Sequence, residues 1–99
     1  MNAISKVSEI TPGAVAQYIR LDPTADDLTT LTMMIGIAKA YIQGYTGLTA
    51  AELDDYEDFC IVVFILCQDM FDNRCLYVDN ANLNAVADAI LGMHRVNLL

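Results

Sequence analysis

Residues 22–47 read DPTADDLTTLTMMIGIAKAYIQGYTG, and this stretch is the clearest structural signal in the chain. Its apolar side chains recur at alternating spacings of three and four residues, which is the period of one helix face. Asp22 or Thr24 caps the start, and Gly47 suits the left-handed conformation that ends a helix. The stretch therefore predicts a long helix with one side in a core. The apolar stripe consists of Leu28, Leu31, Ile35, Ala38, Ile42 and Tyr45.

A shorter helix is predicted just before it, over residues 10–21. Thr11 is placed to cap this helix, and Pro12 fits its first position, where the missing N–H has no partner in any case. The helix ends before Pro23, because the residue that precedes a proline avoids the helical region. Residues 1–9 come before this helix and are predicted to form a flexible N-terminus.

Residues 59–74, FCIVVFILCQDMFDNR, open with a run of nine apolar residues. A helix of that length covers less than half of the roughly 30 Å of a bilayer core, and acids flank the run on both sides, so no membrane span is predicted. The helical spacing of Phe59, Val63 and Leu66 continues into polar residues, which favours a helix buried on all sides. The alternative is a strand buried on both faces, since β-branched residues are frequent in the run.

This third helix is predicted to begin near residues 49–53, where Thr49 and Glu52 stand at the spacing of a capping box. It runs to Arg74, with a break around residues 54–55. At that end a cation stabilises the last carbonyl groups of a helix. The alternative for Arg74 is a bidentate ion pair with a carboxylate of a neighbouring helix or subunit.

A last helix is predicted from Asn80 or Asn82 to about Gly92, and residues 93–99 follow it as a C-terminal tail. The predicted fold class is therefore all-α: a small four-helix bundle with a long second helix, a buried third helix and a short C-terminal helix plus tail. Residues 1–99 form one domain in this interpretation, a size near the lower limit for burying a core unaided.

The composition predicts association with other chains. Hydrophobic residues make up 56% of the chain and charged residues only 18%, against roughly 25% in an ordinary soluble domain. We expect part of the apolar surface to be buried against other chains, first of all copies of this one. The net charge of -8, with thirteen acidic and five basic residues, excludes a non-specific nucleic-acid binder that works by phosphate neutralisation. The first ten residues lack the pattern of a secretory signal, so the chain is expected to stay in the cytosol.

No pattern of catalytic or metal-binding residues is present. Cys60, Cys67 and Cys75 would lie along one side of a helix, but they form no C-x-x-C pair, and His94 is the only histidine. Buried thiols that pack as small hydrophobes explain these residues. His94 falls in the predicted tail without a partner for nucleophilic catalysis, and no glycine-rich phosphate loop appears. The sequence therefore predicts neither an enzyme nor a cofactor.

The acidic segment between residues 52 and 58 lacks the repeated aspartates, the glycine and the later glutamate of a calcium loop. A solvated helix N-terminus explains its charge, because the helix dipole favours acids there. The alternative is an electrostatic role, either lining a surface that must not hold DNA or docking a basic partner.

Four features recur in the same order in a known group of proteins. They are YIRLDPTADD (Tyr18–Asp27), AKAYIQGYTGL (Ala38–Leu48), an apolar helix closing on MFDNR (Met70–Arg74), and a short helix with an arginine close behind. In this order the chain resembles the small head-tail connector, or DNA-packaging adaptor, proteins of long-tailed bacteriophages. It departs from them after Arg74, where Cys75 and Leu76 carry no turn signal.

The resemblance implies a closed, dodecamer-like ring of identical subunits beneath the portal protein of the filled head. Such a ring extends the DNA channel and offers a docking surface to stopper or tail-completion proteins, while DNA passes without specific binding and no membrane is involved. The implied location is the head-tail interface of the virion, with assembly in the host cytoplasm. The implied subunit or portal contacts are Arg74, Met93, His94, Arg95, Leu98 and Leu99. The pool of channel-facing acids is Asp26, Asp27, Asp54, Asp55, Glu57 and Asp58.

A function of another class remains open beside this one. A small cytosolic helical adaptor or regulatory module, acting as a dimer on a basic or amphipathic partner, has the same composition.

Overall fold

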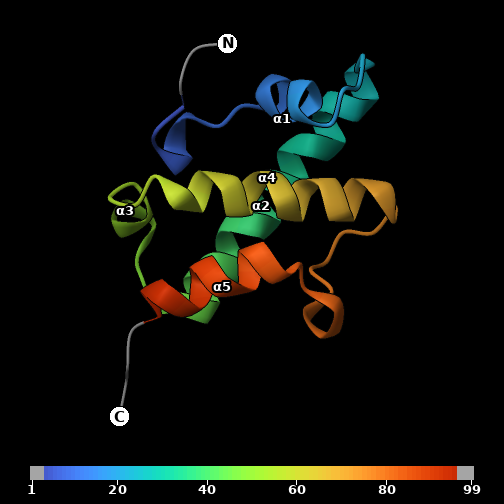
Figure 1. Ribbon diagram of the computed structural model, residues 1–99. Coiled ribbons are helices and arrows are strands. Elements are labelled where there is room, and N and C mark those ends of the chain that lie inside the picture. The colour runs from blue at the N-terminus through green and yellow to red at the C-terminus, as the bar shows by residue number, and fades with distance from the viewer. Residues whose placement is uncertain (1–3, 96–99) are drawn as a thin grey trace.

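The computed structural model describes residues 4–95, and this part of the chain is helical with no strand. Four helices build the body of the protein: α1 (Pro12–Tyr18), α2 (Ala25–Thr46), α4 (Asp58–Asp72) and α5 (Ala85–His94). In Figure 1, α4 crosses in front of α2, with α1 above it and α5 below. The all-α fold class is confirmed, with its long second helix and its short C-terminal helix.

The long helix α2 begins and ends where the sequence predicts. The Thr24 hydroxyl accepts a hydrogen bond from the Asp27 N–H at 3.1 Å, and the Asp27 carboxylate accepts one from the Thr24 N–H at 3.1 Å. At the other end Gly47 has φ 80 and donates its N–H to the Gln43 carbonyl at 2.9 Å. These caps satisfy backbone groups that a helix end leaves without a partner.

The predicted third helix is two helices, separated at the predicted break. The single turn α3 (Ala50–Leu53) carries the predicted capping box, and α4 starts only at Asp58. In between, the Asp55 and Tyr56 N–H groups bond carbonyls three residues back, which tightens the chain into a turn. The helix α4 ends at Asp72, two residues before Arg74.

The N-terminal segment differs from the prediction of a flexible residue range 1–9. Residues 7–9 form a 3-10 helix, η1 (Val7–Glu9), and the side chains of Val7 and Ile10 are buried. They pack against α4, because this helix needs apolar cover on every side that α2 and α5 leave open. Residues 1–3 lie outside the part of the chain described here.

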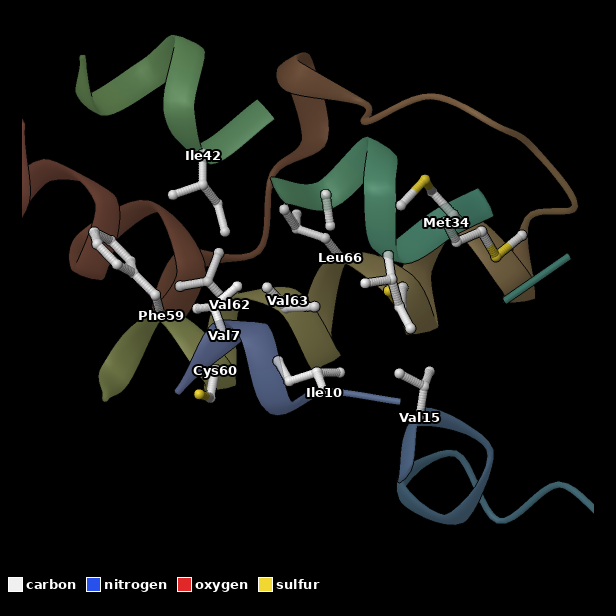
Figure 2. Close-up of a cluster of buried hydrophobic side chains, with 14 of the residues drawn as sticks. Val7, Ile10, Val15, Met34, Ile42, Phe59, Cys60, Val62, Val63 and Leu66 are labelled. Atoms are coloured by element: carbon white, nitrogen blue, oxygen red, sulfur yellow. The ribbon is translucent and has the colours of Figure 1, made fainter. Parts of the chain in front are cut away.

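The helix α4 lies at the centre of the core. It contacts α2, α5, α1 and η1, and Figure 2 shows its side chains meeting those of α2 and of the N-terminal segment. Burying each large apolar side chain contributes about 1.5–3 kcal/mol, so this helix holds the other elements together. Its buried residues are Phe59, Cys60, Val62, Val63, Leu66, Cys67, Met70 and Phe71.

The C-terminal helix starts and ends later than predicted. A short 3-10 helix, η2 (Asn80–Asn82), comes first, and α5 then begins at Ala85 behind Asn84, whose side chain accepts the Val86 N–H at 2.8 Å. The helix continues past Gly92, where an added Cβ would meet nothing within 4 Å. Glycine therefore marks neither a close contact nor the helix end at this position.

Candidate interaction surfaces

The N-terminal end of α4 is joined to the last turn of α5 by a histidine. His94 Nε2 lies 2.8 Å from Asp58 Oδ2. The centroid of its ring lies 4.3 Å from that of Tyr56 in a tilted arrangement and 4.8 Å from that of Phe59 in an edge-to-face arrangement. The prediction that Met93 and His94 belong to a tail is wrong, since both lie in α5. The imidazole contacts residues about 36 positions away in the sequence, and these contacts hold the last turn of α5. No local sequence pattern predicts them.

The other predicted contact residues near the C-terminus divide into two groups. Met93 is 72% exposed on the outer side of α5, and the Arg95 guanidinium lies 5.4 Å from the centroid of the Tyr45 ring. Leu98 and Leu99 lie outside the described residues. Met93 and Arg95 are therefore both exposed in the described chain, and Arg95 has an aromatic ring beneath its charged group.

The predicted channel-facing acids lie in two separate groups. Asp26 and Asp27 start α2, whereas the other four precede or begin α4 near the far end of α2, which is about 33 Å long. The structure does not bring the two groups together. Three of the six acids take part in bonds within the chain, and these are Asp27, Asp54 and Asp58. The other three, Asp26, Asp55 and Glu57, are exposed.

Asp54 is the acid most clearly held by the fold. Its carboxylate accepts the Ser8 N–H at 2.9 Å, a contact between residues 46 positions apart. This backbone hydrogen bond holds the pKa of the Asp54 carboxyl below its ordinary value. The bond fastens η1 to the turn between α3 and α4.

Two arginines close helices in the same unusual way. Arg20 follows α1 with φ 59, and Arg74 follows α4 with φ 53, both in the left-handed region that glycine normally occupies. Each N–H bonds a carbonyl three residues back, and the next residue's N–H reaches a carbonyl five residues back: Leu21 to Ala16 at 2.8 Å and Cys75 to Met70 at 3.0 Å. This pattern is the Schellman motif, built here on arginine.

The side chains of these two arginines differ in their surroundings. The Arg74 guanidinium lies 4.4 Å from the centroid of the Phe71 ring, so it stacks on its own helix. Among residues 4–95 no carboxylate lies within ion-pair distance of Arg74, so a bidentate pair within the described chain is not found. Arg20 is exposed, and among the described residues it has neither an ion pair nor an aromatic ring beneath it. No local pattern in the sequence marks Arg20 as a site, since the usual residue at this cap is glycine or asparagine.

A pocket opens at the C-terminal end of α4, which we name the loop pocket. It encloses about 140 Å³ between α4 and the loop of residues 75–83. Burial, with the nearby Asp72 charge, raises the pKa of the Asp69 carboxyl, and among residues 4–95 that carboxylate receives no hydrogen bond. Asp79, by contrast, is occupied by the N–H and side-chain amide of Asn82. The lining consists of Leu66, Asp69, Met70, Asn73, Cys75, Tyr77, Val78, Asp79, Asn82 and Leu83.

Besides the exposed Val86 and Met93 of α5, two apolar areas made of exposed and half-buried side chains lie on different sides of α4. The first, the α1–α4 surface, consists of Ile4, Tyr18, Ile61 and Phe64; the rings of Tyr18 and Phe64 are 5.1 Å apart, and Ile61 is 50% exposed. A groove of about 370 Å³ runs between Ile4 and α4 and is rimmed by two acids of the segment before and at the helix start. The second area, the loop surface, consists of Leu76 and Tyr77, 48% and 64% exposed, beside the loop pocket.

The three cysteines are free thiols. Burial raises the pKa of the Cys60 thiol to about 11 and that of Cys67 to about 12, so both are protonated at neutral pH and pack as small apolar groups. Cys75 is half-buried, with its sulfur 3.5 Å from the Tyr77 carbonyl. Within residues 4–95 no group of acids, histidines and cysteines is arranged to hold a metal ion. No helix in that range is both long and apolar enough to cross a bilayer.

Comparisons with models of protein families, with curated proteins and with solved structures find no match to this chain.

Proposed function

We propose that this chain is a structural ring protein of the head-tail connector type, in which copies associate around a DNA channel between a portal and the stopper or tail proteins. The proposal draws on the order of YIRLDPTADD, AKAYIQGYTGL and MFDNR along the sequence. The observation that carries it is the position of the exposed apolar side chains.

The α1–α4 surface and the loop surface lie on different sides of the subunit. In Figure 1 α1 lies above α4, while the loop after α4 runs below the end of that helix. Two different patches on different sides of a subunit support a head-to-tail contact, which generates a ring when the rotation closes. One patch that pairs with its own copy would instead favour a dimer.

The charge of the chain supports a channel that DNA passes without being held. Asp26, Asp55 and Glu57 are exposed and without a bonded partner among the described residues, and the net charge is -8. Acids at a channel wall repel phosphates, so no contacts have to break as DNA moves. We expect the purified protein to show no retention of duplex DNA at physiological salt in a gel-shift assay.

Light scattering and electron microscopy of the purified protein test the ring. We expect closed rings, and we expect Ile61→Glu to weaken self-association at least about tenfold, because a charge would then enter the contact. Met33→Glu is the matched control: Met33 on α2 is also 50% exposed but lies outside both surfaces. Both variants should unfold within about 4 °C of the wild type.

A second candidate function is favoured by the groove beside Ile4. Its apolar lining and its acidic rim of Glu57 and Asp58 suit a basic amphipathic segment of another protein, as in the adaptor hypothesis. A dimer that never grows with concentration would favour this function and contradict the ring. Equal assembly of the Ile61→Glu and Met33→Glu variants would also contradict the ring contact described above.

A further inference from the structure

The fold holds Arg20 at the surface in a backbone conformation that most residues avoid. It occupies a left-handed position that disfavours every residue with a Cβ, and it lies two residues after the exposed ring of Tyr18. Its counterpart Arg74 covers Phe71, but Arg20 has no ion pair or stacked ring among residues 4–95. Arginine beside exposed aromatic side chains is typical of protein interfaces.

The loop pocket has the complementary character. Asp69 contributes a carboxylate without a hydrogen-bond partner among the described residues, near the C-terminal end of α4, where the helix dipole disfavours negative charge. The apolar lining from Leu66, Met70 and Leu83 suits the methylene stem of a long side chain. The loop pocket has a volume of about 140 Å³, several times the ~30 Å³ that one water occupies in the liquid, so it has room for more than a single water.

We propose that Arg20 of one copy inserts into the loop pocket of the next copy and pairs with Asp69. The inference rests on the proposed self-association and names the polar contact at its centre. Around this pair, Tyr18 of the first copy would meet Leu76 and Tyr77 of the second, so that apolar side chains exclude water from the ion pair.

The contact joins two copies because of where its halves lie. The turn that follows α1 and the loop that follows α4 are on opposite sides of α4 in Figure 1. A contact between two different patches of this kind is heterologous, and it leaves both patches free at the ends of any open chain of subunits. Closure of that chain into a ring satisfies every pair.

The test uses two glycine variants of the full chain. Arg20→Gly removes the guanidinium and suits the left-handed backbone, so the variant folds, but we expect its self-association measured by sedimentation to be weakened at least about tenfold. Arg74→Gly makes the same backbone change at the other left-handed arginine and should assemble like the wild type. Equal weakening in both variants would overturn the inference.

The acidic partner is tested in the same way. Asp69→Asn should weaken assembly to a similar extent, whereas Asp72→Asn, an exposed neighbour outside the pocket lining, should not. The exchange Arg20→Asp with Asp69→Arg reverses the pair, and aspartate tolerates the left-handed region better than most residues. We expect the double variant to assemble within about threefold of the wild type and each single change to assemble poorly.

The outcomes separate this pairing from the ring itself. Rings that form equally well in Arg20→Gly and Asp69→Asn overturn the pairing and leave the ring. A closed dimer in which the charge exchange restores assembly supports the pairing and overturns the ring. A wild-type chain that stays monomeric at concentrations approaching a millimolar overturns both.

Discussion

The two ends of α4 carry the same type of residue in opposite surroundings. At the N-terminal end, Asp58 bonds the imidazole of His94 and Asp54 accepts the Ser8 N–H, which lowers the pKa of Asp54. At the C-terminal end, burial and the nearby Asp72 raise the pKa of Asp69, and no hydrogen bond within residues 4–95 compensates it.

The helix dipole makes this difference informative. Carboxylates are favoured at a helix N-terminus and disfavoured at a C-terminus. At the N-terminal end of α4, where carboxylates are favoured, Asp54 and Asp58 are bonded by other groups of the same chain. At the C-terminal end, where carboxylates are disfavoured, Asp69 has no partner among residues 4–95. An end of this kind gains most from a cation supplied from outside, which is why we place the partner at the loop pocket.

The largest expected effect tests whether both ends share one core. Phe59→Ala near the first end and Met70→Ala near the second should lower the free energy of unfolding by about 3–5 and 2–5 kcal/mol, since both side chains are fully buried. Urea denaturation followed by circular dichroism measures both. Thr32→Ala, at an exposed position on α2, serves as the control and should change stability by less than about 0.5 kcal/mol. A cost below about 1 kcal/mol for Met70→Ala would mean that the second end is loosely packed.

The next effect concerns the bond that completes the first end. His94→Ala removes the contact with Asp58 and the aromatic contacts with Tyr56 and Phe59, and it should cost about 1–3 kcal/mol. In a domain of this size, each kcal/mol corresponds to a fall in Tm of about 4–8 °C. Met93→Ala, one residue earlier and 72% exposed, is the control and should leave Tm nearly unchanged. If the two variants melt alike, the histidine junction does not stabilise the fold.

A smaller effect distinguishes the two left-handed arginines. Arg20→Gly should raise the free energy of unfolding by about 1 kcal/mol, because glycine adopts φ 59 without the steric penalty of a Cβ. Arg74→Gly should gain less, since it also loses the contact with Phe71, worth about 0.5–1 kcal/mol. Thermal melts of dilute monomer measure both. A loss of stability in Arg20→Gly would indicate that its side chain is engaged within its own subunit.

The smallest effect is a difference in sign between the two acids as pH changes. The Asp54 pKa lies below its ordinary value of 3.8 in the folded chain, so its contribution to stability is present above that pH and is lost as pH falls through the folded pKa. The Asp69 pKa is raised, so its ionised form destabilises the fold once pH exceeds the folded pKa, and the penalty vanishes below 3.8.

Denaturation of two asparagine variants across acidic and neutral pH measures this difference. Asp54→Asn should be less stable than the wild type at neutral pH and equal to it in acid, apart from any constant offset. Asp69→Asn should be more stable at neutral pH, with the gain disappearing in acid. Curves that shift in the same direction would contradict the contrast between the two ends of α4.

Much of the fold was predictable, because its signals are local. The stripe of α2 and its Gly47 end involve residues within one or two helical turns, and both were predicted correctly. The N-terminal cap was predicted as Asp22 or Thr24, and the structure selects Thr24 and adds its capping box with Asp27. A break around residues 54–55 was also predicted, and the structure has it between Leu53 and Asp58. The extent of α5 was not, because Gly92 suggested an end that the contacts of His94 override.

The candidate site was much less predictable, because it is made of long-range contacts. Arg74 was expected to act at a helix end, yet nothing in the residue type distinguished its stacked side chain from the open one of Arg20. The six candidate acids were treated as one pool, and the path of α2 separates them into two groups.

The order of residues alone determined the helical fold class, the bounds of α2, the acidic charge and the excess of apolar side chains. Helical period depends on residues close together in the chain, and charge and composition depend on no contact at all. The folded chain adds the bonds of Ser8 with Asp54 and of His94 with Asp58, which join positions 46 and 36 residues apart. It also leaves Asp69 half-buried and unpaired within the described chain while Arg20 stands exposed. Such pairings depend on how helices cross, and one residue's identity says nothing about which distant residue will lie beside it.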